Sequence, residues 1–246
     1  MESETKLPPA TISPSQKMAQ EQFTSQITGI TYPVDVYVPE GYAEAREPFP
    51  VIYALDGQWS YDGYVDILRE KETAVILVSI HQGPEGRRDT DYLLPAAVDF
   101  YQFLTTELIP HIEGQYKIDP NNRTLVGVSY GGMFVSTALF IEDVESPYFH
   151  NYVSADAPFL YTHRTKTMDL ERERYNKSHQ MPARLLLTSA LLDASIGPFD
   201  EHVTTFQQRL EKRGFEGLEI SRRAYEVDHF DVGNPTFTDA VALFFE

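Results

Sequence analysis

The sequence contains no cysteine among its 246 residues. This absence excludes a disulfide framework, a thiolate metal site and a cysteine nucleophile. It leaves the cellular compartment open, because a chain of this length can bury a sufficient core without disulfides.

Long apolar runs are also missing. The first residues, MESETKLPPA, lack the basic and apolar regions of a signal peptide, and no run is long enough to span a bilayer. We therefore expect a soluble protein without membrane insertion. It is cytoplasmic as the sequence stands, or periplasmic or secreted if a signal peptide has been removed.

Positive charge is scarce, since 20 Lys and Arg face 37 Asp and Glu and leave a net charge of −17. Nucleic-acid binding rests largely on Lys and Arg, so this balance argues against nucleic acid as a partner. No phosphate loop, dinucleotide-binding glycine pattern or zinc-spaced histidine pair occurs, and we predict no cofactor and no metal.

Hydrophobic residues are present in short runs, which organise the chain into one domain. Residues 1–17 are polar and predict a flexible tail, and residues 18–246 predict a single domain. Two alternating stretches, residues 22–27 and 32–38, predict an antiparallel hairpin. Continuous apolar runs then predict buried parallel strands at residues 49–55, 74–80, 123–128, 152–154 and 184–188, with a last strand at about 218–227.

Helical spacing appears between these strands, at about residues 95–113, 133–140, 200–213 and 237–245. Such alternation predicts the α/β class, with a mostly parallel twisted sheet flanked by helices. Residues 156–183 form either a small cap over a pocket or a plain crossover connection.

The strongest motif is Gly127-Val128-Ser129-Tyr130-Gly131, which follows a predicted strand and precedes a predicted helix. This is the context of a nucleophile elbow, in which small neighbours allow a strained serine to stand on a tight turn. We predict that Ser129 is a nucleophile and that the Tyr130 N–H stabilises an oxyanion.

A serine hydroxyl needs a base, and in this kind of fold the order along the chain is serine, acid, histidine. His229 follows the last predicted strand and is the predicted base. Asp193, which follows the predicted strand at 184–188, is the predicted acid that orients it. The competing acids are Asp156, Asp200, Asp228 and Asp231, and a Ser–His dyad stays open as well.

The loop after the first central strand, Leu55-Asp56-Gly57-Gln58-Trp59, is expected to supply the second oxyanion donor. The Gln58 N–H is the first choice and the Gly57 N–H the second. Trp59 either lines the acyl pocket or packs against its neighbours.

These residues resemble the putative-esterase (esterase D-like) branch of the α/β-hydrolase superfamily, near its siderophore and feruloyl esterases. Four blocks carry the resemblance: residues 51–57, residues 88–92 followed by Pro95, residues 107–113 leading to Ser129, and Asp228-His229. The resemblance implies the α/β-hydrolase fold, the Ser129–His229–Asp193 triad, and a bracing role for Arg88 and Asp91. It also suggests a pocket among loops near Trp59, Tyr92 and Phe159.

The leading hypothesis is a serine carboxylesterase that acts on a small-molecule ester through an acyl-enzyme. The alternatives are a siderophore trilactone or feruloyl-type esterase, acyl transfer to an acceptor other than water, and a catalytically silent binding protein of the same fold. A homodimer stays open.

Overall fold

The computed structural model describes residues 20–160, 166–192 and 197–246. Within them, eight strands form one sheet in the order β1-β2-β4-β3-β5-β6-β7-β8. Their bounds are β1 (Glu21–Thr24), β2 (Thr31–Tyr37), β3 (Phe49–Leu55), β4 (Ile76–Ile80), β5 (Ile118–Val128), β6 (Asn151–Ala155), β7 (Gln180–Ala190) and β8 (Glu216–Tyr225).

The sheet is antiparallel only at its N-terminal edge. β1 pairs with β2 and β2 with β4 in antiparallel register, whereas every pair from β4 to β8 is parallel. This confirms the predicted fold class, a mostly parallel sheet with a leading hairpin. Parallel strands all end at one edge, so the residues that follow β3, β5, β6 and β8 are brought together there.

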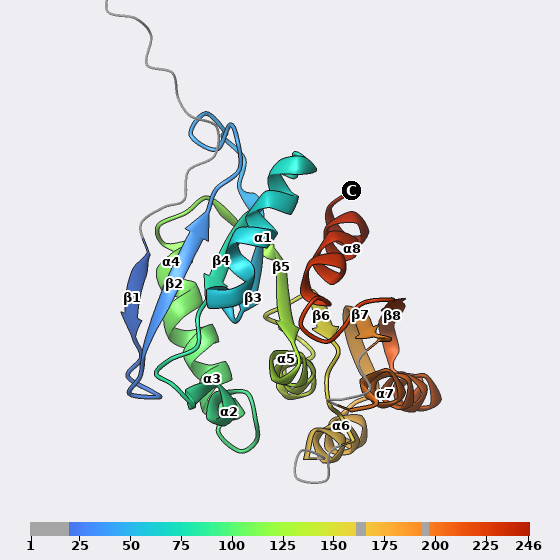
Figure 1. The fold of residues 1–246 in the computed structure, drawn as a ribbon. Coiled ribbons are helices and arrows are strands. Elements are labelled where there is room, and N and C mark those ends of the chain that lie inside the picture. The colour runs from blue at the N-terminus through green and yellow to red at the C-terminus, as the bar shows by residue number, and fades with distance from the viewer. Residues whose placement is uncertain (1–19, 161–165, 193–196) are drawn as a thin grey trace, which may run out of the picture.

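Helices cover both faces of the sheet (Figure 1). Their bounds are α1 (Gly57–Glu70), α2 (Arg87–Asp91), α3 (Ala97–Phe103), the π-helical turn η1 (Leu104–Leu108), α4 (Ile109–Glu113), α5 (Tyr130–Ile141), α6 (Lys166–Lys177), α7 (Phe199–Arg213) and α8 (Gly233–Phe245). α1 and α8 pack on one face, and α3, α5 and α7 pack on the other.

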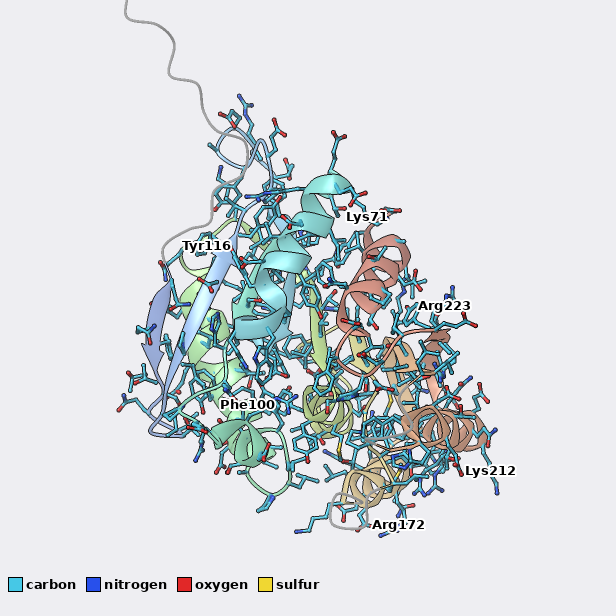
Figure 2. The ribbon with its side chains drawn as sticks, in the orientation of Figure 1. Lys71, Phe100, Tyr116, Arg172, Lys212 and Arg223 are labelled. Carbon is cyan, nitrogen blue, oxygen red and sulfur yellow. The ribbon has the colours of Figure 1, made fainter. Side chains whose placement is uncertain are left out.

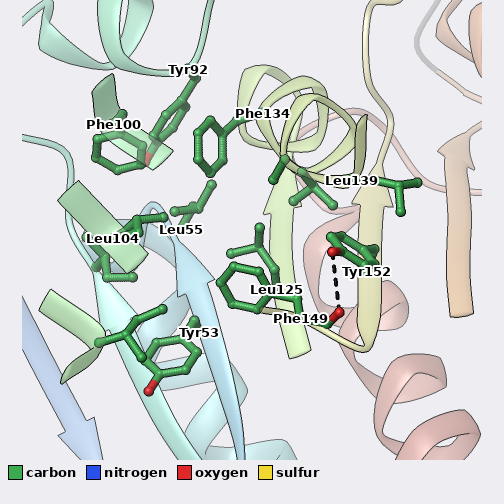
Figure 3. Packing of buried hydrophobic residues seen from close by; sticks show 14 of the residues in the cluster. Tyr53, Leu55, Tyr92, Phe100, Leu104, Leu125, Phe134, Leu139, Phe149 and Tyr152 are labelled. Atoms are coloured by element: carbon green, nitrogen blue, oxygen red, sulfur yellow. Dashed lines mark hydrogen bonds between the residues drawn. The ribbon is translucent and has the colours of Figure 1, made fainter. Parts of the chain in front are cut away.

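The core shows why the strands read as continuous apolar runs. In β3, Tyr53 and Leu55 join the cluster under α3 and α5, while Ile52 and Ala54 join the cluster under α1 and α8. Figure 3 shows the first cluster, where Phe100 meets Phe134 edge-on with 5.0 Å between ring centroids. From Val51 to Leu55, each residue of β3 is thus buried on one face of the sheet or the other.

Helix α1 is not among the predicted helices, because the sequence predicts a loop at residues 55–59. The helix begins at Gly57, directly after Asp56, whose backbone is left-handed with φ of 60°. Its buried face carries Tyr61, Tyr64, Val65 and Leu68. Their spacing of three, four and seven residues was the available signal.

The region considered as a cap contains α6, which is fixed to the body of the molecule. Glu171 of α6 is fully buried and forms ion pairs with Arg209 and Arg213 of α7, at 2.5 and 2.6 Å. The predicted tail, residues 1–17, lies outside the described residues.

Charged side chains extend outward from the ribbon, as Lys71, Arg172, Lys212 and Arg223 do in Figure 2, whereas Phe100 lies among the elements. Across residues 20–160, 166–192 and 197–246, no helix has both the length and the apolar character that crossing a bilayer requires.

Candidate active site

Ser129 stands between the end of β5 and the start of α5, as the motif predicts. Its backbone adopts φ of 58° and ψ of −118°, a conformation that L-residues rarely adopt. The Ser129 N–H donates to the carbonyl of Ala155 at 2.8 Å, which fixes the turn to the neighbouring strand β6. Strain of this kind at a residue with a reactive hydroxyl is typical of a functional site.

The glycines of the motif allow the strand and the helix to meet. A Cβ atom on Gly127 would lie 2.4 Å from the carbonyl carbon and oxygen of Gly131. A Cβ on Gly132 would lie 3.0 Å from the Ala155 carbonyl oxygen. Both neighbours are backbone atoms, so the elbow excludes a side chain at Gly127.

His229 lies in the turn after β8, where its side chain is 11% exposed. Its Nδ1 is 2.6 Å from Oδ2 of Asp156, a carboxylate that is 1% exposed. A carboxylate can only accept, so Nδ1 carries the proton and Nε2 is left as the basic nitrogen. This is the tautomer that a general base requires.

Asp156 is itself held in place from several directions. It directly follows β6 and has φ of 47°. Its Oδ1 accepts from the Ala190 N–H at 3.0 Å, and its own N–H donates to the Thr188 carbonyl at 2.8 Å. Both carboxylate oxygens are therefore engaged, one by β7 and the other by the histidine.

The predicted acid, Asp193, lies outside the described residues. The structure instead joins His229 to Asp156, which the sequence reading ranked among the competing acids. Two other competitors are engaged elsewhere. Asp200 forms an ion pair with Arg222, and Asp228 accepts from the Phe230 and Asp231 N–H groups.

Ser129 and His229 line one cavity of about 700 Å³. Within the described residues, the side chains of Ser129 and His229 do not form a hydrogen bond with each other, and such contacts are often long before a substrate binds. Around this cavity lie Leu55, Asp56, Trp59, Ser60, Tyr64, Arg88, Val128, Ser129, His229, Phe230, Asp231, Gly233 and Asn234.

The predicted oxyanion loop forms the first turn of α1. The Trp59 and Ser60 N–H groups donate to the Asp56 carbonyl. Among the described residues, no backbone carbonyl accepts from the Gly57 or Gln58 N–H group. Unpaired N–H groups at a helix start are suited to bind an anion. Neither Gly57 nor Gln58 is among the residues that line the cavity, although Asp56 and Trp59 on either side of them are. The Tyr130 N–H stands at the corresponding position in α5.

Arg88 lines the cavity and binds both the turn at Asp56 and the end of β5. It forms a bidentate pair with Asp56, at 2.8 and 2.9 Å, and also donates to the Val128 carbonyl at 3.1 Å. Burial raises the pKa of Asp56, and the hydrogen bonds from Arg88 oppose that rise. The guanidinium carbon also lies 5.6 Å from the ring centroid of Trp59. Arg88 thus connects the Asp56 loop to the end of β5, a bracing role.

The three predicted pocket residues differ in position. Trp59 lines the cavity and is 69% exposed. Tyr92 and Phe159 lie in the core and not at this cavity, because Tyr92 packs on Phe100 and Phe134 and Phe159 stacks on Phe206 at 3.9 Å. Sequence reasoning did not find Tyr64, Phe230 and Asn234, and no residue of α6 lines the cavity.

Residues 25–220 match the model of the family described as "Putative esterase". The chain belongs to this family.

One curated relative is itself named as an esterase. Over 180 residues the chain is 25% identical to the ferri-bacillibactin esterase BesA of Bacillus subtilis, a match that covers 59% of this chain and 60% of that protein. The chain therefore spans less than two thirds of the length of that curated relative.

Solved structures support the fold. An IroE-like serine hydrolase from Shewanella oneidensis superposes with a TM-score of 0.80 at 24% identity, covering 93% of this chain and 80% of that one. The siderophore hydrolase EstB from Aspergillus nidulans gives a TM-score of 0.75 at 19% identity, covering 97% and 98%. These likenesses establish the α/β-hydrolase fold.

Metal-ligating side chains do not gather in the part of the chain that the structure describes, where no three of His, Asp and Glu are arranged to hold an ion.

Proposed function

We propose that this protein is a serine esterase that hydrolyses a carboxylic ester through an acyl-enzyme. The observation that carries the proposal is the convergence of Ser129, on a strained turn, and the Asp156-bound His229 at one cavity. Membership of the esterase family supports the same reaction.

Each step falls to a residue of this chain. His229 Nε2 takes the Ser129 proton as Oγ attacks the ester carbonyl, and Asp156 stabilises the imidazolium that forms. The N–H groups of Tyr130 and of Gly57 or Gln58 hold the oxyanion. His229 then protonates the leaving alcohol, and it later activates the water that releases the acyl group.

The test compares wild type with Ser129→Ala on short 4-nitrophenyl esters. We expect the variant to lose hydrolysis down to the background rate, and a fluorophosphonate probe to label the wild type at Ser129. Turnover by Ser129→Ala at the wild-type rate would refute the assignment. An intact fold with no labelling would favour the catalytically silent binding protein.

A siderophore ester is the finer proposal for the substrate. It is supported by the curated relative BesA, whose name gives ferri-bacillibactin as its substrate, and by the exposed rings of Trp59 and Phe230 at the cavity. The net charge of −17 disfavours polyanionic ligands. Binding of a negatively charged siderophore therefore depends on the local charge at the cavity. Hydrolysis rates on siderophore trilactones, feruloyl esters and simple alkyl esters distinguish these substrates.

A further inference from the structure

Tyr64 is a buried residue of the cavity that the catalytic steps do not use. It lies on α1, is 1% exposed, and stacks on Phe237 of α8 with 3.9 Å between ring centroids. This stacking covers a face of the ring and leaves the hydroxyl end near the cavity, which Tyr64 helps to line.

The position of the hydroxyl is defined by its neighbours. A Cβ atom on Gly233 would lie 3.5 Å from the Tyr64 Oη and 3.8 Å from Cγ2 of Val128, the residue before Ser129. Gly233 and Val128 both line the cavity. Tyr64 Oη therefore lies near Gly233 and Val128, beside the turn that carries Ser129.

This hydroxyl has no hydrogen-bond partner within residues 20–160, 166–192 and 197–246. The neighbouring tyrosine of the same helix face, Tyr61, donates to the Val36 carbonyl at 3.4 Å. Burial raises the pKa of Tyr64, so the group stays protonated and able to donate. A hydroxyl on a cavity wall that makes no hydrogen bond within the protein can donate to a ligand bound in that cavity.

The groups around Tyr64 define the kind of oxygen that would bind. Asn234 packs against Gly63, where a Cβ atom would lie 2.8 Å from the Asn234 Oδ1, so a neutral amide lies on the same wall. The cation of the cavity, Arg88, is already paired with Asp56. The charge of Asp56 also acts on Tyr64 and adds to the rise of its pKa. A carboxylate or phosphate at the hydroxyl would be repelled by this carboxylate, so a neutral acceptor is favoured.

We infer that the Tyr64 hydroxyl is a specificity-determining hydrogen-bond donor, and that the preferred ester carries a neutral accepting oxygen within a few atoms of its scissile bond. This inference rests on the proposed esterase function. An ether, hydroxyl or second ester oxygen meets the requirement, whereas a plain alkyl chain leaves the donor unsatisfied.

The experiment uses esters that differ by one exchange of CH₂ for oxygen. The acyl arm compares 4-nitrophenyl butyrate with 4-nitrophenyl methoxyacetate, and the alcohol arm compares butyl butyrate with 2-methoxyethyl butyrate. For each enzyme, kcat/KM for the oxygenated ester is divided by kcat/KM for its plain partner. The difference in intrinsic reactivity between the two esters cancels when this ratio is compared between enzymes. In Tyr64→Phe we expect this ratio to fall roughly tenfold in at least one arm, about the worth of one neutral hydrogen bond.

Tyr61→Phe is the matched control, since it removes a hydroxyl from the same helix that bonds elsewhere, and its ratios should equal those of wild type. Equal ratios in wild type and Tyr64→Phe in both arms would overturn the inference. A lower melting temperature for Tyr64→Phe would also overturn it, because the hydroxyl would then stabilise the fold. If Ser129→Ala retains hydrolysis, the proposed function itself fails, and this outcome is separate from either result at Tyr64.

Discussion

The carboxylate that accepts from His229 Nδ1 decides how the base is held. Asp156 binds the ring at 2.6 Å and is anchored by the Ala190 N–H. The amide of Asp156→Asn would offer a donor or a weaker acceptor to the ring, favouring the wrong tautomer. We expect kcat to fall about 10³- to 10⁴-fold, with little change in the melting temperature. Steady-state kinetics on a 4-nitrophenyl ester measure this loss.

Asp193→Asn is the control for that experiment. It should retain kcat within about twofold of wild type if Asp156 is the acid. The reverse pattern, with activity lost in Asp193→Asn and kept in Asp156→Asn, would show that Asp193 is the acid, as the sequence predicts.

The position of Ser129 on a turn between a strand and a helix is predictable from the sequence, because its signal is local. Ser129 is recognised because its flanking glycines and the change from strand to helix are contiguous in the chain. The acid is different, since Asp156 and Asp193 both follow buried strands. Which of them reaches the ring depends on the twist and register of β6, β7 and β8, which no local pattern encodes.

At the scale of elements, β5 and α5 cross so closely at Gly127 and Gly131 that no side chain fits between them. Gly127→Ala places a methyl group 2.4 Å from backbone atoms of Gly131, which cannot move aside as a side chain would. We expect the variant to lose several kcal/mol of unfolding free energy, or to open the elbow and lose activity. Denaturant unfolding and fluorophosphonate labelling measure the two effects.

Gly114→Ala provides the comparison for that substitution. Gly114 has φ of −70° and ψ of −15°, and a Cβ there meets no atom closer than 3.3 Å. We expect a change within about 1 kcal/mol. A loss equal to that of Gly127→Ala would show that loss of glycine, and not the crossing, is responsible.

The elements themselves were predicted unevenly. Strands buried on both faces are conspicuous as apolar runs, and the leading hairpin, β1 and β2, follows from alternation. Helix α1 was missed because glycines at 57 and 63 and the loop-like Asp56-Gly57 pair obscured its periodicity. Missing the helix also hid Tyr64, whose position depends on α1.

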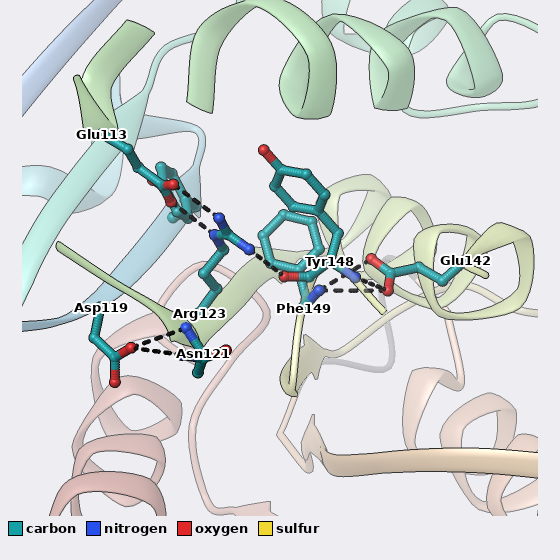
Figure 4. Close-up of polar contacts among 8 residues, drawn as sticks. Glu113, Asp119, Asn121, Arg123, Glu142, Tyr148 and Phe149 are labelled. Atoms are coloured by element: carbon teal, nitrogen blue, oxygen red, sulfur yellow. Dashed lines mark hydrogen bonds and ion pairs between the residues drawn. The ribbon is translucent and has the colours of Figure 1, made fainter. Parts of the chain in front are cut away.

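In the whole molecule, acidic side chains are divided unevenly between the surface and the core. Most carboxylates of the described residues lie at the surface, but six are buried: Asp35, Asp56, Asp91, Glu142, Asp156 and Glu171. Glu142 accepts from the Tyr148 N–H at 2.6 Å and from the Phe149 N–H at 3.2 Å, as Figure 4 shows, and Tyr101 donates to it at 3.0 Å. Burial raises the pKa of Glu142 to about 7, although these hydrogen bonds oppose the rise.

This buried group makes stability depend on pH. With its pKa raised on folding, Glu142 holds a proton in the folded protein that the unfolded chain releases, so its contribution is full below about pH 4.5 and is lost as pH rises through about 7. Relative to Glu142→Gln, wild type should lose a few kcal/mol of unfolding free energy across that window. Denaturant unfolding of both proteins at intervals from pH 4.5 to 8 measures the difference.

Glu145→Gln removes the same charge from an exposed position nearby. Its difference from wild type should stay nearly constant over this pH range. A difference between wild type and Glu142→Gln that does not change with pH would contradict the assignment of the titration to Glu142.

The position of Asp156 has a consequence for how such a protein diversifies. In the proposed mechanism the nucleophile and the partner of the base directly follow adjacent strands, β5 and β6, and the connection after β7 is not required to supply either of them. Exposed Leu191 and Leu192 begin that connection. Insertions, deletions and substitutions in this connection would not move the reacting groups. The substrate range of related proteins can therefore change while the catalytic mechanism is kept.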